Sequence, residues 1–224
     1  MIAPEALRAL ADAAGEGGLA EHAPARLDGV ELSATLRPAD GEALARVLSA
    51  LGQAGLAAVL RGAGSHLGLG NPPRGAELFL SLERLPGVDE LDEVEGICHV
   101  ASGTPLSTLR EKLATTAWEL PLDVPGTLGG CLAAARIGPR SLGFGLPRDV
   151  VLGLEVALGS GQRTRCGGRV VKNVTGYDLA KLYIGSLGSL GGIEGAWLRL
   201  RPRPACVRAL ELEAADVAAA GQAG

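Results

Sequence analysis

The chain has 224 residues, of which 47% are hydrophobic, and its formal net charge is -4 at neutral pH. This length can bury one large core or two closely packed halves. No apolar run approaches the length needed to span a bilayer, and the net charge gives no electrostatic case for binding nucleic acid. The N-terminus carries Glu5 and Asp12 and lacks a basic start and a cleavage pattern. Residues 1–15 therefore predict a short surface helix and not a signal peptide.

The cysteine and histidine residues give no indication of a metal centre. The four cysteines are widely scattered without a Cys-x-x-Cys pair, which argues against zinc or iron–sulfur ligation. We expect reduced, mostly buried thiols, as in a cytoplasmic protein. His22 and His99 are expected to be structural or solvated residues and not ligands.

Glycine is the most informative residue type of this chain. There are 34 glycines, well above the average share of about 7%, and they gather in clusters. Two clusters, at 61–70 and 126–145, follow apolar or extended segments. Without side chains, the backbone N–H groups of such loops can approach a large anionic ligand. Two such loops far apart in the sequence suggest a cofactor held from two sides, although a lone glycine loop is also an ordinary turn between strands.

The first cluster follows a helix and a strand. Residues 38–60 predict a helix with an apolar face, an N-cap at Asp40 and a stop at Gly52 or Gly55, and then a buried strand at 56–60. The loop begins Gly-Ala-Gly, but position 67 is Leu and two prolines follow at 72 and 73. No helix can therefore open directly after it, which excludes the Rossmann dinucleotide fingerprint. We expect a non-helical nest of backbone N–H groups, suited to a pyrophosphate.

The middle of the chain predicts strands at 78–82 and 97–101. Thr104 is expected to cap a helix that has Pro105 at its first position and ends near residue 117. An extended stretch at 121–125 leads into the second glycine loop, 126–130, and residues 131–135 can form a short helix.

The last third predicts a strand from Asp149, closed into a hairpin by Gly159–Gly161. A short helix is expected from Asp178, then a third glycine cluster at 185–192 and an alternating strand over 193–201. Hairpins and helices are interleaved, so the fold class is α+β with mixed or antiparallel sheets. The chain after residue 204 resembles the opening of a further domain.

Five segments in this order resemble the vanillyl-alcohol-oxidase or p-cresol-methylhydroxylase type of FAD-binding flavoproteins, over about residues 37–204. They are RGAGSHLGLG, PLDVPGTLGG, GFGLPRDVVLGLEVALGSG, VVKNVTGYDLAKL and GSLGSLGGIEGAWLRLRP. KNVTGYDL and GSLGSLG are most similar to the FAD-binding subunit of bacterial glycolate oxidase. The resemblance implies a two-part FAD-binding domain, with halves at about 37–101 and 102–204, after an N-terminal segment of residues 1–36.

The resemblance also implies which residues contact FAD. The first loop would wrap the pyrophosphate, and the second would continue toward the flavin ring. Two later glycines would let the chain pass the cofactor, and the backbone after the last cluster would meet the adenine. These residues are, in order, Arg61, Gly62, Ala63, Gly64, Ser65, His66, Leu67, then Pro125, Gly126, Thr127, Gly129, Gly130, then Gly138 and Gly145, then Gly192 and Ile193. For Lys172, Asn173, Tyr177 and Asp178, a flavin contact and a structural role both remain open.

Some relatives attach FAD covalently through a histidine directly after the glycine pair. Here Ser65 holds that position and His66 follows it, so we expect FAD to be bound non-covalently. The resemblance also leads us to expect that the cap domain is absent or truncated, with residues 205–224 as its start or as a tail. No catalytic residue and no metal ligand can be assigned from the sequence.

Two functions are compatible with these features. The first is a flavin redox subunit of a complex that oxidises glycolate or another small 2-hydroxy acid, beside a second flavin subunit and an iron–sulfur subunit. The second is an assembly subunit of the same complex that binds FAD weakly or not at all. The KNVTGYDL and GSLGSLGG segments argue against a reductase of cell-wall precursor synthesis, which shares the fold. The expected location is the cytoplasm, with any membrane association through partner subunits.

Overall fold

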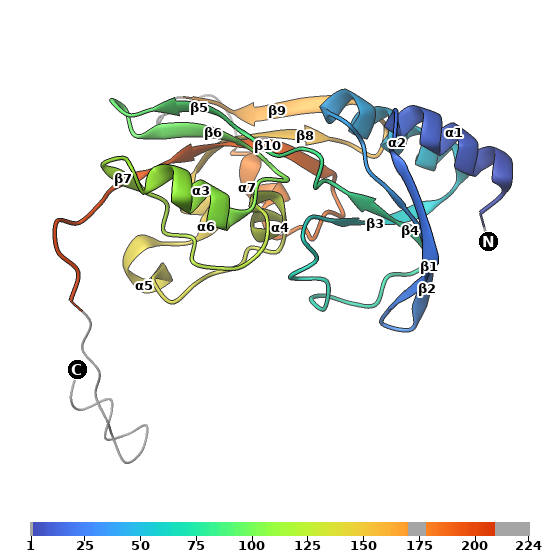
Figure 1. The fold of residues 1–224 in the computed structure, drawn as a ribbon, viewed down its shortest axis with the longest axis horizontal. Helices are drawn as coiled ribbons and strands as arrows, with labels where there is room; N and C mark the ends of the chain where they lie inside the picture. Colours follow the sequence, from blue (N-terminus) through green and yellow to red (C-terminus); the bar gives the residue numbers. More distant parts are fainter. Residues whose placement is uncertain (1, 170–177, 209–224) are drawn as a thin grey trace, which may run out of the picture.

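The computed structural model describes residues 2–169 and 178–208. The N-terminal half is a four-stranded sheet flanked by two helices (Figure 1). Its strands are β1 (Leu19–Leu27), β2 (Val30–Leu36), β3 (Ala57–Arg61) and β4 (Ala76–Ser81), in the order β1-β2-β4-β3. β1 and β2 are antiparallel, whereas β4 pairs in parallel with both β2 and β3. The helices α1 (Pro4–Ala14) and α2 (Gly41–Ala54) pack against each other beside this sheet.

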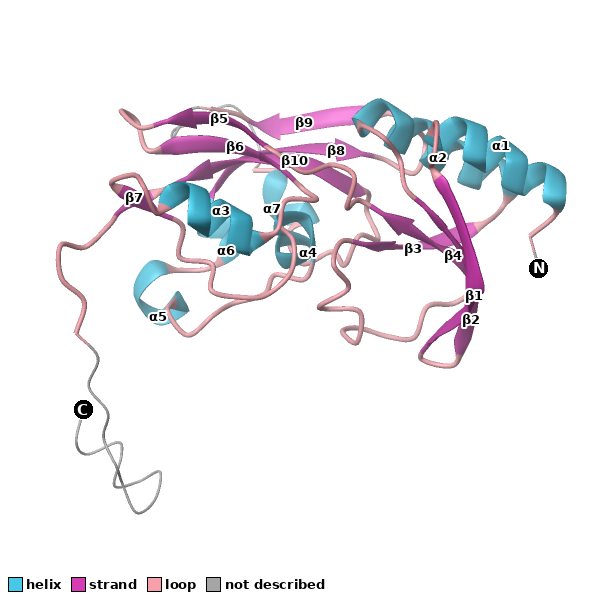
Figure 2. Ribbon diagram, viewed as in Figure 1, coloured by secondary structure: helices cyan, strands magenta, loops and turns pink. Residues whose placement is uncertain are grey.

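The second half is a five-stranded antiparallel sheet whose first strand begins at Val88, so this half starts earlier than the expected residue 102. It contains β5 (Val88–Asp92), β6 (Ile97–Ala101), β8 (Val151–Ala157), β9 (Arg163–Gly167) and β10 (Gly192–Arg199), in the order β5-β6-β10-β8-β9. The short strands β7 (Trp118–Glu119) and β11 (Arg201–Pro202) form a separate pair. Below the sheet lie α3 (Leu106–Leu113), α4 (Leu128–Ala133), α5 (Ser141–Phe144), α6 (Pro147–Val150) and α7 (Ala180–Tyr183) (Figure 2).

Each half has its own apolar core. In the first, the alternating residues of β2 and β4 meet the apolar face of α2, including Leu44, Val47 and Leu51. In the second, the inward side chains of β6, β8 and β10 pack on Leu106, Leu109 and Leu113 of α3 and on α4. Burial of these leucine side chains removes apolar surface from water and stabilises the fold, and Ala157 of β8 joins the first core.

Most predicted elements are confirmed. The Asp40 carboxylate accepts a hydrogen bond of 2.7 Å from the Ala43 N–H at the start of α2, and Gly55 ends the helix in the left-handed region (φ 64°). The hairpin at 159–161 joins β8 to β9 as expected. The fold combines helices with one mixed and one antiparallel sheet, in agreement with the predicted class.

Other expectations were wrong in detail. Thr104 does not cap α3, because its hydroxyl donates to the Gly87 carbonyl (2.9 Å) and accepts from the Gly87 N–H (2.8 Å). That helix ends at Leu113, one turn before residue 117. The second glycine loop is shorter than expected, since helix α4 already begins at Leu128.

The N-terminal segment belongs to the first sheet. β1 and β2 lie within residues 1–36, and β2 pairs directly with β4. The expected domain boundary near residue 37 therefore falls at the end of β2, which is part of the first sheet. Among the described residues, no helix is both long and apolar enough to cross a bilayer.

Candidate functional site

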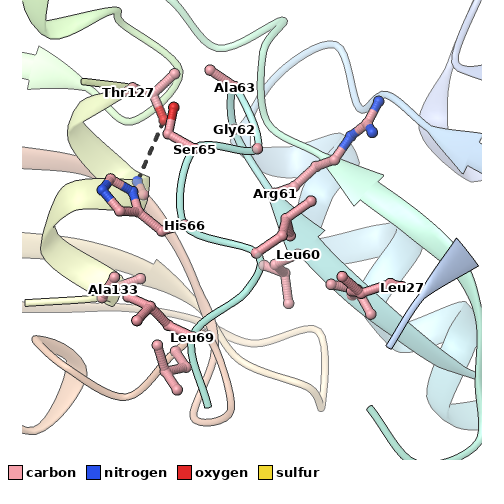
Figure 3. A pocket seen from close by; sticks show the side chains of 18 of the residues that line it. Leu27, Leu60, Arg61, Gly62, Ala63, Ser65, His66, Leu69, Thr127 and Ala133 are labelled. Carbon is pink, nitrogen blue, oxygen red and sulfur yellow. Dashed lines mark hydrogen bonds between the residues drawn. The ribbon is translucent and has the colours of Figure 1, made fainter. Parts of the chain in front are cut away.

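A cavity of about 360 Å³ lies between the end of β3 and the start of α4. The three glycine clusters meet there, although they are far apart in the sequence. Figure 3 shows the loop after β3 crossing the space between the first sheet and α4, with His66 on the side of α4 and Arg61 on the side of the first sheet. The cavity is lined by Leu27, residues 58–67, Leu69, Asn71, Pro73, Gly126, Thr127, Gly130, Ala133, Ala134 and residues 187–189.

The first glycine loop supplies a row of free backbone donors. After Arg61, whose carbonyl accepts from the Leu82 N–H, the chain leaves the sheet without forming a helix. Within the described part of the chain, the backbone N–H groups of residues 62–66 have no hydrogen-bond acceptor. Consecutive N–H groups of this kind form an anion-binding nest. The sequence prediction of a non-helical loop is confirmed.

The second cluster is the N-terminus of a helix whose donors are already used. The Leu128 and Gly129 N–H groups donate to the carbonyls of Thr104 (2.9 Å) and Ser102 (2.8 Å). The Gly130 N–H donates to the Thr127 hydroxyl at 3.4 Å, the hydrogen bond drawn in Figure 3. This segment is therefore tied to the end of β6.

Glycine lets the two clusters touch. A Cβ atom on Gly62 would collide with the Thr127 hydroxyl, and one on Gly126 would lie 3.0 Å from the Ser65 hydroxyl. Gly126 also has a φ of 102°, a conformation that other residues rarely adopt. These contacts bring the first loop against the second and hold the two halves at a fixed distance.

The third cluster closes the cavity from the opposite side. The Leu187 N–H donates to the Ala133 carbonyl (2.8 Å), which ties this segment to the end of α4. Gly188 has a φ of 78° and lies against Leu60 of β3. One segment thus contacts both halves.

A second, smaller cavity of about 50 Å³ adjoins the first. The two cavities share Leu60, Gly62, Thr127 and Gly188, among others. Its walls are mostly apolar or glycine. Beyond the shared residues it is lined by Leu82, Ser102, Gly129, Gly191 and Ile193.

The electrostatic character of the site is neutral to positive. No Asp or Glu lines either cavity in the described structure, and Arg61 is the one permanently charged lining residue. Its guanidinium lies over the Phe79 ring, 4.5 Å from the centroid. Partial burial, with a smaller contribution from the positive charge of Arg136, lowers the pKa of His66 below its ordinary value of 6.5. The imidazole is therefore neutral at pH 7.

The structure brings most of the predicted site residues together. Residues 61–67, Gly126, Thr127, Gly129, Gly130 and Ile193 line the two cavities. Pro125 and Gly192 lie directly beside lining residues. Gly138 packs against Asp123, and Gly145 precedes α6 and lies against Asp149, so neither lines a cavity here. Lys172, Asn173 and Tyr177 lie outside the described residues, and Asp178 pairs with Lys181 at 3.0 Å.

Sequence reasoning missed several lining residues, most of them apolar side chains such as those of β3, and two of the missed sets are informative. Leu187, Gly188 and Ser189 belong to the third cluster, of which only the last glycine and Ile193 were expected at the cofactor. Ser102 follows β6, and nothing in its local sequence distinguishes it from a turn residue. The density of glycine over 185–192 could have indicated that Leu187, Gly188 and Ser189 lie at the cavity.

Comparison with known proteins identifies the family. Residues 32–167 match the family model described as FAD binding domain. The chain belongs to this family. It is 36% identical over 160 residues to the glycolate oxidase subunit GlcE of Escherichia coli, which covers 69% of this chain and 45% of that protein. It is 31% identical over 193 residues to the glycolate oxidase subunit GlcD of Bacillus subtilis, and this match covers 84% of this chain and 41% of that protein. The mitochondrial D-2-hydroxyglutarate dehydrogenase of Danio rerio is 33% identical over 177 residues, a match that covers 77% of this chain and 33% of that protein.

Solved structures show the same fold. Alkyldihydroxyacetonephosphate synthase superposes with a TM-score of 0.75 at 19% identity, covering 92% of this chain and 42% of that one. Phl p 4, a glucose dehydrogenase, superposes with a TM-score of 0.74 at 16% identity, and the match covers 89% of this chain and 44% of that one. The chain spans less than half the length of these relatives and structures.

The residues present fit FAD, the cofactor of this family. An anionic pyrophosphate needs several hydrogen-bond donors and no carboxylate facing it. The N–H groups of residues 62–66 and the guanidinium of Arg61 supply the donors, and no Asp or Glu is among the described lining residues. The glycines leave open the space that Cβ atoms would fill, and the smaller cavity adds an apolar recess for a flat ring. In the described residues there is no cluster of three or more His, Cys, Asp or Glu side chains that could hold a metal ion.

Proposed function

We propose that this chain binds FAD non-covalently in the cavity between its two halves, as the flavin subunit of a complex that oxidises a small 2-hydroxy acid. The observation that carries the proposal is the row of five unpaired N–H groups at residues 62–66, in a cavity lined by all three glycine clusters. A polar backbone group left without a partner is unfavourable unless water or a ligand satisfies it. A pyrophosphate held there satisfies several of these groups at once.

Each part of the site has its own task. The first loop binds the pyrophosphate, and Gly126 and Thr127 extend the cradle across the second half. The third cluster, with Gly188 against Leu60, closes the side of the cavity. When bound, FAD supplies the ability to accept electrons from an organic substrate, and the protein sets the position and surroundings of its ring.

Non-covalent binding is supported by the chemistry at the histidine position. Ser65 stands directly after the glycine pair, and its hydroxyl lies close to Gly126. His66 is the next residue in the sequence. Its side chain lies on the side of α4, as Figure 3 shows, and its neutral ring lines the cavity. We propose that this ring contacts the cofactor without a covalent bond.

The proposed substrate class and partners follow from the relatives. Two of them are named as glycolate oxidase subunits, and others are named as dehydrogenases of D-2-hydroxyglutarate and D-lactate. A further pair is named as FAD-linked oxidoreductases. We therefore propose glycolate or a similar 2-hydroxy acid as substrate, and a second flavin subunit and an iron–sulfur subunit as partners.

Among the described lining residues, His66 is the one side chain that could act as a general base toward a 2-hydroxy acid, because they include no carboxylate, lysine or tyrosine. Since we propose that His66 contacts the cofactor, this lining favours a division of labour in which the groups that handle the substrate proton come from outside the described site. It also keeps open the assembly role, in which the chain holds the complex together.

The test is anaerobic reduction of the FAD-loaded chain, alone and after co-purification with its partner subunits. Bleaching of the visible flavin absorbance by glycolate or D-lactate supports the redox role. Bleaching only in the complex assigns the substrate-handling groups to a partner. A chain that assembles with the partners but takes up no FAD assigns it to assembly.

A further inference from the structure

The first glycine loop touches the second half of the protein at two places, one near each of its ends. Near its start, Gly62 lies against the Thr127 side chain. Near its end, Gly70 lies so close to Leu187 of the third cluster that an added Cβ atom would be 2.7 Å from the Leu187 Cδ1 atom. The Leu187 N–H donates in turn to the Ala133 carbonyl of α4 (2.8 Å). The loop, α4 and the third cluster therefore form a closed ring, and residues from all three line the larger cavity.

The two contacts of this ring differ in how easily they can open. Thr127 is 3% exposed, and its hydroxyl accepts a hydrogen bond from the Gly130 N–H at 3.4 Å. Leu187 is 49% exposed, and it meets Gly70 with the end of its side chain. An exposed side chain changes rotamer rapidly, without any rearrangement of the core. The contact between Leu187 and Gly70 is therefore the one that can open while both halves stay folded.

The backbone of Leu187 indicates that its side chain has a task. Its φ is 54°, in the left-handed region where glycine is favoured. The other residues of this cluster with a positive φ are all glycine, namely Gly185, Gly188 and Gly191. Leucine is less favourable than glycine in this conformation, because its Cβ atom crowds the following carbonyl oxygen. A leucine kept at the position that contacts Gly70 points to a function of the side chain.

Leu187 also lies where the two cavities adjoin, since it lines both of them. The unpaired N–H groups of residues 62–66 belong to the same loop as Gly70 and line the larger cavity. A dinucleotide bound to these groups lies within the ring, and the contact between Leu187 and Gly70 narrows its way in. An apolar side chain at this place has no hydrogen bond to offer, so its effect on a ligand is steric.

From this geometry, and resting on the proposed binding of FAD, we propose that Leu187 is a gate residue for the cofactor. The ring is closed while the side chain lies on Gly70, and rotation of the side chain away from Gly70 opens it so that FAD can enter or leave. The same contact has to open in both directions, so Leu187 slows association and dissociation by similar factors. It sets how fast FAD exchanges and has little influence on how tightly FAD binds.

The test is the kinetics of FAD exchange in Leu187→Ala, which removes the atoms that reach Gly70. Stopped-flow flavin fluorescence gives the association rate constant, and dilution of the FAD-loaded protein gives the dissociation rate constant. If the gate is open about a tenth of the time, both rate constants should rise about 10-fold. The dissociation constant should change by less than about threefold, whereas the loss of a simple ligand contact raises mainly the dissociation rate. Leu187→Gly should have the same kinetic effect, because the side chain and not the backbone strain forms the gate.

The matched control is Leu190→Ala. Leu190 is also half exposed (50%) and belongs to the same segment, but it lines neither cavity. Both rate constants should therefore stay within about twofold of those of the parent. The inference is overturned if Leu187→Ala raises the dissociation rate without the association rate, if it changes neither, or if Leu190→Ala has the same effect. An unaltered protein that binds no FAD would instead contradict the proposed function, and this inference would fail with it.

Discussion

The first and second glycine clusters look alike in sequence and use glycine for different purposes. In the first, residues 62–66 leave five backbone N–H groups unpaired along the cavity. In the second, the N–H groups at the start of α4 are bonded to Thr104, Ser102 and Thr127. Glycine in the first cluster exposes backbone donors to a ligand. Glycine in the second permits close contact between parts of the protein.

This difference shows how the two halves form one site. The second cluster fixes α4 against β6 and brings Thr127 to the surface of the first loop, where only a glycine fits at position 62. The first loop can then keep the donors of residues 62–66 free, because packing maintains its position and its own hydrogen bonds use the N–H groups of Leu67 and Leu69. A ligand-binding loop held in this way is pre-organised for its ligand.

The largest expected effect is that of Gly62→Ala. The added methyl group would collide with the Thr127 side chain, and overpacking of this kind costs about 1–3 kcal/mol in free energy of unfolding. FAD affinity should fall as well, because the loop must shift. Chemical unfolding and a flavin titration measure the two effects.

The control is Gly68→Ala in the same loop, where an added Cβ meets nothing within 4 Å. It should change the free energy of unfolding by less than about 0.5 kcal/mol. Adding Thr127→Ala to Gly62→Ala should recover part of the loss, since the colliding atoms are removed. Equal effects of the alanine substitutions at 62 and 68 would contradict the account of the contact.

A smaller effect separates two neighbouring glycines of α4. Both Gly129→Ala and Gly130→Ala gain helix propensity, about 0.5–1 kcal/mol. At position 129 the new Cβ would lie 2.7 Å from the Ser102 Cβ, whereas at 130 its nearest neighbour is the Thr127 hydroxyl at 3.3 Å. Thermal unfolding should show net destabilisation at 129, by about 1–2 kcal/mol, and a neutral or slightly stabilising change at 130. The reverse order would show that the contact with β6 does not require glycine.

The smallest expected effect concerns pH and His66. Burial first, and the charge of Arg136 second, lower the pKa of His66 in the folded protein. The unfolded chain therefore binds more protons between the folded pKa and about 6.5, so the free energy of unfolding falls as pH decreases through this window. His66→Gln should flatten this part of the pH–stability curve. In an NMR titration, Arg136→Gln should raise the pKa of His66 only in part, because burial remains.

Much of the fold could be predicted because its signals are local. The apolar spacing of α2, the carboxylate of Asp40 and the glycine turn at 159–161 each depend on a few neighbouring residues. The candidate site could be predicted for the same reason, since glycine-dense segments permit a close backbone approach to a ligand. Family resemblance then supplied the cofactor, which the comparisons support.

What could not be predicted depends on contacts between distant residues. Threonine is a residue type that often caps helices, but the hydroxyl of Thr104 bonds to Gly87, 17 residues earlier in the sequence and before β5 and β6. β1 and β2 join the first sheet only because β4 lies beside β2.

The most direct test of the central claim is the visible absorption spectrum of the purified chain supplemented with FAD, before and after acid precipitation. The account predicts flavin bands that accompany the folded protein through gel filtration and pass into the supernatant after acid treatment. Bands that remain in the pellet would show covalent attachment and contradict the assignment of His66. A protein that stays colourless with added FAD, while folded by circular dichroism, would contradict the proposed site itself.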